Sequence, residues 1–188
     1  MKNPLTTYAK ALLKERSGFI VERPGDGSRY YVGCCYYGLS VPAYMYDEIR
    51  VVSGLFPVLE PGTRARSNSR GEIPGVTPID GVGMFPAIMD AIPDTHTPAA
   101  DWKTTMELDS GSVAVLTSAK SPIFVNSAYW ALLRDVCPDR YRGGRATDIV
   151  YLGNPGVDSV YGVVCPVNNG PARDRLEDLT AAMEAIRA

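Results

Sequence analysis

The sequence predicts an α+β fold in which antiparallel strands dominate and a few helices cover them. Three observations lead to this prediction. The segment from Arg29 to Val41 is rich in aromatic and β-branched residues and is the strongest β segment. Between Pro4 and Arg16, apolar residues recur at spacings of three and four, as in an amphipathic helix. The 18 glycines and 15 prolines fall mostly between apolar runs, which predicts many short elements joined by turns.

In the first half of the chain, Ser17-Gly18 is expected to end the first helix. A strand beginning at Phe19 should then pair with the segment from Arg29 to Val41, through a turn at residues 24–28. Gly33 and Gly38 inside the second strand indicate a bulge or a close backbone approach. Residues 43–52 fit either another strand or a short helix.

Residues 54–80 are rich in proline, glycine and arginine and are predicted to be a linker. Arg64, Arg66 and Arg70 in this stretch have two interpretations. They are either a solvated loop or a loop that contacts phosphate. The segment Met84–Pro93 follows, where Pro86 and Pro93 pin an apolar connector that cannot be one regular helix.

In the second half, the sequence predicts strands and two helices. Asn126 or Ser127 is expected to cap the first helix, and the second should bury a stripe of leucine, methionine and isoleucine. The expected strands are residues 104–108, 112–117, 122–125, 148–152 and 160–167, and the expected helices are residues 128–136 and 171–187.

These elements predict one compact domain with an internal division. A strand–helix–strand–strand unit in the second half, with a weaker counterpart before it, suggests two similar half-units. The predicted parts are an N-terminal half (residues 1–53), the linker (54–80), a C-terminal half (81–167) and a C-terminal helical tail (168–188).

Composition limits the classes of function. The formal net charge of −2 gives no global basic field for nucleic acid, so any such contact needs a local basic patch. No apolar stretch approaches the length of a membrane span, and the N-terminus does not resemble a signal peptide. We therefore expect a soluble, cytoplasmic protein whose four cysteines are reduced.

The sequence lacks the common signatures of catalysis. The single histidine, His96, excludes a two-histidine mechanism, and there is no G-x-S-x-G motif. There is no C-x-x-C pair and no phosphate-binding glycine loop with its lysine. We expect a binding or assembly protein rather than an enzyme, and we assign no catalytic residue, metal or cofactor.

Three stretches, in chain order, resemble the DNA sliding clamp family, in particular the bacterial β-clamp. They span about residues 80–167, and a weaker likeness involves Leu39 and Ser40 in Y-V-G-C-C-Y-Y-G-L-S-V. The three are F-P-A-I-M-D-A-I-P (85–93), P-I-F-V-N-S-A-Y-W-A-L-L-R-D-V (122–136) and D-I-V-Y-L-G-N-P-G-V-D-S-V-Y-G-V-V-C-P-V (148–167).

The resemblance implies clamp-like antiparallel sheets with a few helices, a non-enzymatic role in DNA replication and self-association into a homo-oligomer. It implies that basic side chains face duplex DNA, here Arg134, Arg140, Arg142 and Arg145. It also implies an apolar pocket for peptide motifs of replication proteins, here formed by Leu39, Pro86, Ala91, Val164, Cys165, Pro166 and Val167.

A second hypothesis belongs to a different class. The chain would be a small interaction protein of a phage or mobile element, an inhibitor or regulator of a host protein with no role on DNA. The net negative charge and the extra terminal helix favour this hypothesis, whereas the arginine clusters favour the first.

Overall fold

A computed structural model describes residues 3–81, 83, 97–98, 100–108, 111–117, 122–137, 141–143, 149–153 and 160–167. Its helices are α1 (Pro4–Leu12), α2 (Tyr46–Arg50) and α4 (Ser127–Val136), and a 3-10 turn, η1 (Ala43–Met45), precedes α2. The strands are β1 (Ile20–Arg23), β2 (Arg29–Gly33), β3 (Tyr37–Pro42), β4 (Thr63–Arg66), β5 (Val76–Pro78), β6 (Thr97–Pro98), β7 (Ala100–Leu108), β8 (Gly111–Thr117), β9 (Pro122–Asn126), β10 (Tyr141–Gly143), β11 (Val150–Leu152) and β12 (Tyr161–Val164).

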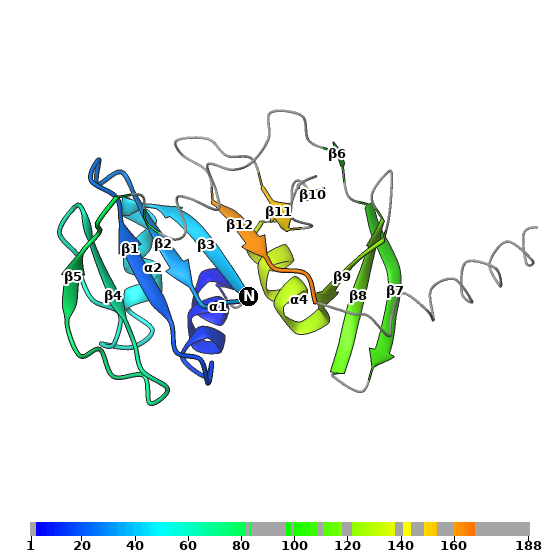
Figure 1. The fold of residues 1–188 in the computed structure, drawn as a ribbon, viewed down its shortest axis with the longest axis horizontal. Helices are drawn as coiled ribbons and strands as arrows, with labels where there is room; N and C mark the ends of the chain where they lie inside the picture. Colours follow the sequence, from blue (N-terminus) through cyan, green and yellow to red (C-terminus); the bar gives the residue numbers. More distant parts are fainter. Residues whose placement is uncertain are drawn as a thin grey trace, which may run out of the picture.

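The strands form two antiparallel sheets, which confirms the predicted α+β class (Figure 1). The larger sheet has nine strands in the order β5-β4-β1-β2-β3-β12-β11-β10-β6, and the smaller has the order β7-β8-β9. Every neighbouring pair is antiparallel. The second half of the chain thus completes the sheet that the first half begins.

The described chain contains two half-units of the same order. In each, a helix precedes three antiparallel strands, α1 with β1-β2-β3 and α4 with β10-β11-β12. The last strands of the two half-units, β3 and β12, pair with each other at the centre, where Leu39 lies opposite Gly162. The two helices pack against each other. The antiparallel pairing of β3 with β12 therefore relates the two half-units approximately by a twofold axis.

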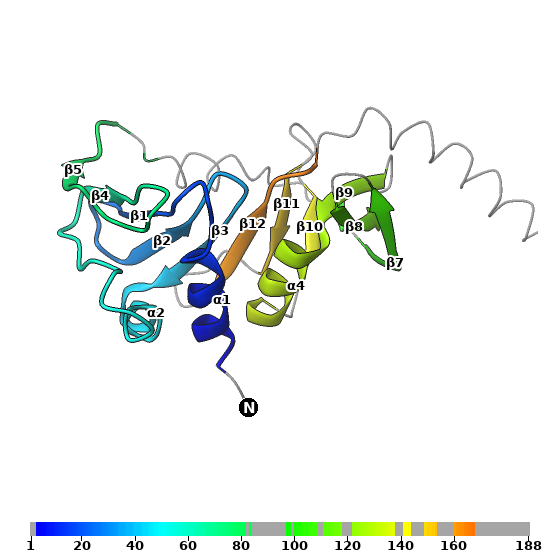
Figure 2. The same cartoon turned by 90° about the horizontal axis from the view of Figure 1, so that it is seen from below.

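All three described helices lie on one face of the nine-stranded sheet (Figure 2). The main core fills the space between this face and the helices. Tyr8 and Leu12 from α1, Leu133 from α4 and Leu39 from β3 are fully buried there. Because successive strand residues point to opposite faces, alternate residues of β1, β2, β11 and β12 form a second cluster on the other face.

The first helix begins where the sequence predicts. The Asn3 side chain accepts a hydrogen bond from the Leu5 backbone N–H, and Pro4 occupies the first turn, where its missing N–H costs nothing. The helix ends at Leu12, several residues before the predicted stop at Ser17-Gly18, and Gly18 then reverses the chain with φ of 74°. A Cβ at this position would lie only 2.5 Å from the Ser67 carbonyl oxygen, so glycine is required on two counts.

The segment from Arg29 to Val41 is two strands and not one. The chain turns at Cys35 and Tyr36, where the Cys34 N–H donates to the Tyr37 carbonyl oxygen at 2.8 Å. The two interior glycines, Gly33 and Gly38, lie directly opposite each other beside this turn. No proline or asparagine marks the turn, so the sequence pattern did not reveal it.

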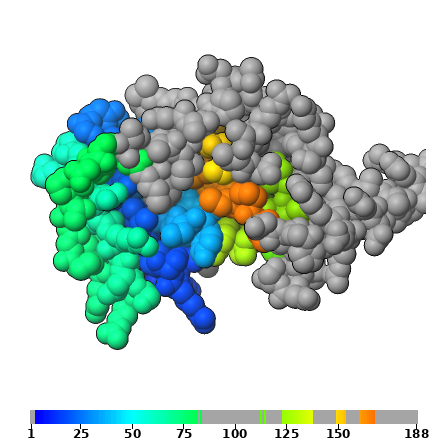
Figure 3. Space-filling view, viewed as in Figure 1, coloured from blue at the N-terminus to red at the C-terminus, as the bar shows by residue number. Residues whose placement is uncertain are grey.

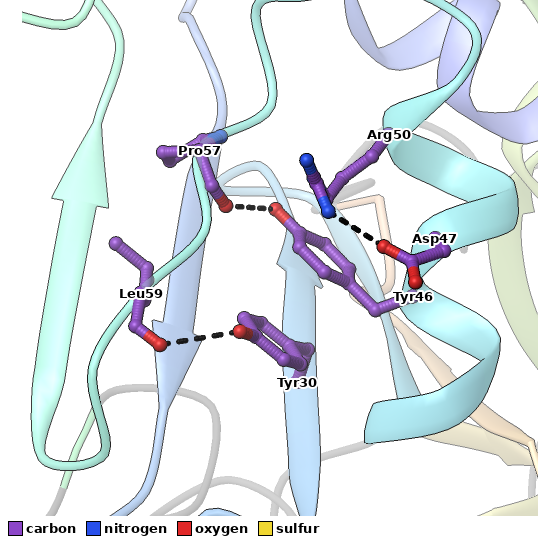
Figure 4. Close-up of polar contacts among 6 residues, drawn as sticks. All are labelled: Tyr30, Tyr46, Asp47, Arg50, Pro57 and Leu59. Atoms are coloured by element: carbon purple, nitrogen blue, oxygen red, sulfur yellow. Dashed lines mark hydrogen bonds and ion pairs between the residues drawn. The ribbon is translucent and has the colours of Figure 1, made fainter.

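The prediction of a linker over residues 54–80 was wrong in part, because this stretch contains β4 and β5. Strand β4 pairs with β1 and carries β5 at the sheet edge. The preceding segment is fixed by two tyrosines that stack at a centroid distance of 3.8 Å (Figure 4). Tyr46 donates to the Pro57 carbonyl oxygen at 2.8 Å, and Tyr30 donates to that of Leu59 at 3.2 Å.

Residues 43–52, for which the sequence allowed a strand or a helix, form η1 and α2. Helix α4 was predicted almost to the residue, and Asn126 caps it by accepting from the backbone N–H groups of Ala128 and Tyr129. This helix packs against β12 of the large sheet and against β8 and β9 of the small one. It therefore contacts both sheets and joins them.

Two predicted elements, the connector Met84–Pro93 and the helix of residues 171–187, lie outside the described residues, as does His96. In the part of the chain that is described, no helix has the length and apolar character needed to cross a membrane.

Candidate functional site

The predicted peptide pocket is divided by the structure. Leu39 and Val164 are fully buried in the main core, each with 0% exposure, so they support the fold and do not line a surface. Cys165, Pro166 and Val167 are half-buried and follow β12. Two further residues of the predicted pocket lie outside the described residues, Pro86 and Ala91.

The residues predicted to contact DNA are also dispersed. Arg134 is exposed on α4. The backbone of Arg142 lies in β10, opposite Tyr151 of β11. Arg140 and Arg145 lie outside the described residues.

The half-buried residues after β12 form an extended bridge between the two sheets. The Cys165 N–H donates to the Tyr36 carbonyl oxygen at 2.8 Å, at the turn between β2 and β3. The Val167 N–H donates to the Phe124 carbonyl oxygen of β9, also at 2.8 Å. Figure 3 shows residues 160–167, which include this segment, in orange at the surface beside light-blue residues of the first half. The bridge is thus fixed at both ends by backbone hydrogen bonds.

An exposed tyrosine lies next to this bridge. Tyr36 is 51% exposed and its ring is nearly parallel to that of Tyr129 on α4, at an angle of 13° and a centroid distance of 6.2 Å. The Tyr129 ring also contacts that of Tyr37, at 4.4 Å. Large aromatic side chains supply much of the contact energy where proteins bind one another. Tyr36, Tyr129 and residues 165–167 are called the aromatic surface below.

A half-buried carboxylate fixes the inner side of this surface. Glu15 accepts hydrogen bonds from the Tyr37 hydroxyl at 3.1 Å and from the Tyr129 hydroxyl at 3.4 Å. Burial, and then the charge of Glu15, raise the pKa of Tyr129 to about 12. Both tyrosines therefore stay protonated donors at neutral pH, and they join the turn after α1 to β3 and α4.

The solvent side of the helix layer is the second candidate surface. Thr7, Lys10 and Lys14 are exposed at spacings of three and four, opposite the buried stripe of α1. Helices α1 and α4 pack against each other on the same face of the large sheet (Figure 2), and Arg134 is exposed on α4.

Acidic residues offset part of this charge. Asp135 is exposed on α4, and Asp47 on α2 pairs with Arg50 at 2.6 Å. In the described residues, α1 and the turn that follows it carry the exposed cations Lys10, Lys14 and Arg16, with Glu15 as the carboxylate between the last two. Lys10, Lys14, Arg16 and Arg134 are called the basic helix surface below.

The opposite face of the sheet carries a row of polar residues in register. Glu22, Tyr31, Ser40 and Tyr161 occupy directly opposite positions on β1, β2, β3 and β12. All four are buried, and Glu22 has no exposed surface at all. Arg29 lies beside the row and is 8% exposed. A buried row of this kind must satisfy its own hydrogen bonds.

The contacts within this row are specific. The Arg29 Nε donates to Ser40 Oγ at 2.6 Å and its Nη2 donates to the Ser40 carbonyl oxygen at 3.2 Å. The guanidinium lies 4.7 Å from the centre of the Tyr161 ring, and the hydroxyls of Tyr31 and Tyr161 are 3.3 Å apart. Burial, and then the contact with Tyr161, raise the pKa of Tyr31 well above its usual range.

The row does not have the geometry of a nucleophilic centre. The Ser40 hydroxyl oxygen accepts from a cation, which withdraws electron density, whereas an activated serine donates its proton to a base. Among the described residues, no three or more histidine, cysteine, aspartate or glutamate side chains are placed to hold a metal ion. The row's contacts instead fix the central strands of both half-units to one another.

A shallow hollow of about 360 Å³ lies where α1, α2 and α4 meet. Its walls are mostly apolar, and the Asn3 side-chain amide donates to the Glu48 carboxylate at 2.6 Å at its edge. The Glu48 carboxylate already accepts this hydrogen bond, so the hollow has little polar chemistry with which to select a ligand.

Sequence reasoning missed the aromatic surface and the polar row. Tyr36 could have been found only if the turn at Cys35 had been recognised, because a central strand would have hidden it. The row had a detectable signal, since Glu22, Arg29, Tyr31 and Ser40 alternate with apolar residues along their strands. Their alignment depends on strand register, which one sequence does not fix.

Comparison with known proteins assigns no function to these surfaces. No family model, no curated protein and no solved structure matches this chain.

Proposed function

We propose that the chain is a non-enzymatic, clamp-like DNA accessory protein that places its basic helix surface against duplex DNA. The observation that carries this proposal is the pairing of α1 and α4 on one face of a continuous sheet made by two half-units. Clamps likewise turn helices towards the DNA, with their sheets behind them. The resemblance of the sequence to that family and this arrangement support the same proposal by separate routes.

The electrostatics fit a weak and sequence-independent contact. Lys10, Lys14, Arg16 and Arg134 provide four cationic groups, and no base-reading element is required. Each phosphate that a cation neutralises releases counterions, so affinity should fall as salt rises, with a slope of about −0.9 per contact on a log–log plot. A clamp-like protein needs only such long-range contacts, because encirclement retains it on the duplex.

Reversing the charge of two lysines tests the proposed DNA side. We expect Lys10→Glu with Lys14→Glu to abolish most binding to a DNA duplex at low salt and to make the salt slope shallower by roughly 1.8. The matched control is Arg66→Glu with Arg70→Glu, which makes the same charge change at exposed residues of β4 and the loop after it. Fluorescence anisotropy with a labelled duplex gives both quantities.

The control also identifies a wrong assignment. Arg66 and Arg70 belong to the arginine group with the alternative interpretation of a phosphate-contacting loop. If the control pair lowers affinity more than the lysine pair, the DNA side is not the helix layer. Light scattering with and without nicked circular DNA then tests encirclement, and a strict monomer that never associates with DNA would refute the clamp proposal.

The aromatic surface favours a second candidate function, binding of a peptide segment of a partner protein. Tyr36 is half exposed beside a bridge that is fixed by backbone hydrogen bonds, so a peptide could bind without a large ordering cost on this side. Because Val164 is fully buried, a charge there would unfold the chain and is no test of the surface.

Tyr36→Ser is the informative change for this second candidate. We expect it to weaken binding of a clamp-motif peptide at least tenfold in a calorimetric titration, while the urea midpoint changes little, because Tyr36 is largely outside the core. Tyr44→Ser is the control, since Tyr44 is 68% exposed on η1. Equal effects of the two changes, or no binding by the wild-type chain, would rule out the aromatic surface as the peptide site.

A further inference from the structure

Two accessible thiols come together where the half-units meet. Cys35 is exposed in the turn between β2 and β3, and Cys165 is half-buried immediately after β12. The four cysteines are all free thiols in this structure. We propose that Cys35 and Cys165 are a reversible thiol pair, which low-molecular-weight disulfides oxidise to a cross-link between the two half-units.

The backbone brings the pair within reach of a disulfide. The Cys165 N–H donates to the Tyr36 carbonyl oxygen at 2.8 Å, which continues the pairing of β12 with β3 by one residue. Directly opposite residues in such a ladder have Cα atoms about 4.5–5.5 Å apart. Cys35 is the next residue along, and disulfides join Cα atoms that are roughly 4.4–6.8 Å apart.

The Cys165 side chain already points towards the backbone of residue 35. Its sulfur lies 3.8 Å from the Cys35 carbonyl oxygen. Cys35 belongs to a two-residue turn, whose side chains are less constrained than those within a ladder. Formation of the Cys35–Cys165 bond therefore requires rotation of side chains and no change of strand register.

The other two cysteines are poor competitors. Cys34 and Cys137 are 2% and 3% exposed and both belong to the main core. The Cys34 sulfur accepts a hydrogen bond from the Tyr36 N–H at 3.4 Å, and burial raises the pKa of this thiol to about 11. Since the thiolate is the attacking species, these two thiols should react only when the chain unfolds.

The proposed reaction balances in two exchange steps. The Cys35 thiolate attacks one sulfur of oxidised glutathione, which forms a mixed disulfide and releases one glutathione thiolate. The Cys165 thiolate then attacks the Cys35 sulfur, which forms the Cys35–Cys165 bond and releases the second glutathione. The two cysteines are oxidised, the glutathione disulfide is reduced, and the two thiol protons go to water or to the departing thiolates. Burial raises the pKa of Cys165, so the second step should accelerate with rising pH.

The cross-link would covalently fix the aromatic surface, because Tyr36 and residues 166–167 adjoin the two sulfurs. It would also close a long loop between the half-units, which constrains the unfolded chain. The inference depends on the thiol geometry alone and holds whether or not the chain binds DNA.

The test is oxidation of the folded chain in glutathione buffers, followed by acid quenching, alkylation and peptide mapping under non-reducing conditions. Trypsin leaves Cys35 within Tyr30–Arg50 and Cys165 within Ala146–Arg173. We expect these two peptides to be joined, and the oxidised chain to unfold at a higher urea concentration than the reduced chain. Cys34→Ala should keep the cross-link, which assigns it to Cys35.

Two further variants separate the steps. Cys165→Ser should stop the reaction at a mixed disulfide on Cys35, and Cys137→Ala should cross-link like the wild type. The proposal is overturned if the wild-type chain also stops at the mixed disulfide, if Cys34 pairs with Cys35, or if only disulfide-linked dimers form. Circular dichroism of the reduced variants confirms that each one is folded before oxidation.

Discussion

A single glycine allows the two half-units to meet at the centre of the sheet. Gly162 of β12 lies opposite Leu39 of β3, and a Cβ at this position would be 3.1 Å from the Cδ2 atoms of both Leu39 and Leu133. These distances are tighter than ordinary van der Waals contact, so a side chain here must displace both leucines. The close packing of β3, β12 and α4 therefore depends on the absence of a side chain at residue 162.

We expect Gly162→Val to lower the free energy of unfolding by about 1–3 kcal/mol, as for other overpacked cores. Urea denaturation followed by circular dichroism measures this change. Gly54→Val is the matched control, because nothing lies within 4 Å of a Cβ at that exposed turn, and its effect should stay within about 0.5 kcal/mol. The free energy lost in the double variant Gly162→Val with Leu39→Ala should be smaller than the sum of the losses in the two single variants. Strictly additive losses would contradict the packing argument.

At the scale of elements, helix α4 is the connection on which both sheets depend. It follows β9 without a loop, so the Asn126 cap also sets the direction in which the chain leaves the small sheet. The Asn126 side-chain oxygen accepts from two backbone N–H groups, at 3.0 and 3.2 Å. A loss of this cap should therefore affect the packing of α4 against both sheets.

Replacing the cap should have a measurable cost. We expect Asn126→Ala to lower the free energy of unfolding by roughly 0.5–2 kcal/mol, and Asn126→Asp to lower it far less, because aspartate caps equally well. Both values come from urea denaturation of purified variants. An alanine variant as stable as the wild type would mean that packing alone holds the start of α4.

The sequence predicted those elements that carry their own local signals. Helices α1 and α4 have caps and apolar stripes, and β8 and β9 have uninterrupted apolar runs, so all four were found. Their predicted bounds match the observed ones within one residue, except that α1 ends at Leu12, before the predicted stop at Ser17-Gly18. Strands β4 and β5 were missed because Arg64 and Pro78 resemble loop residues. Their strand structure results from pairing with β1, a contact between distant segments that local propensity does not report.

The candidate surfaces were less predictable for the same reason. Leu39 and Val164 were expected to line a pocket because the resemblance to sliding clamps implied it, and the sequence alone does not fix which side of its sheet a strand residue faces. In the structure they face the helices and belong to the core. The aromatic surface combines a turn, a helix and the bridge after β12, and only tertiary structure places Tyr36 beside Tyr129.

The whole molecule combines two buried layers on one sheet. On one face the helices enclose an apolar core, and on the other face a polar row crosses the central strands of both half-units. The same strands serve both layers because their side chains alternate. Loss of the hydrogen bonds in this polar row would therefore loosen the junction between the half-units as well as the outer face. We therefore expect the two half-units to unfold together.

Buried thiols and phenols should make this cooperative unit sensitive to alkali. Burial raises the pKa of Cys137 from about 9 to about 12 and that of Cys34 to about 11, and it raises the pKa of Tyr37 well above its usual range. The unfolded chain releases these protons at the ordinary pKa values, whereas the folded chain retains them. Between about pH 9 and pH 11 the folded state therefore binds more protons, and its stability must fall as the pH rises.

Urea midpoints at about pH 7.5, 8.5, 9.5 and 10.5 measure this dependence. Below about pH 8 these groups keep their protons in both states, so we expect the urea midpoint to stay almost constant. Above about pH 9 we expect it to fall steeply. Cys137→Ala should lower stability at neutral pH, because it leaves a small cavity, but it should make the alkaline fall shallower, since one buried proton no longer has to be released. A variant with the same alkaline slope as the wild type would show that Cys137 does not contribute to the pH dependence, whatever its role in packing.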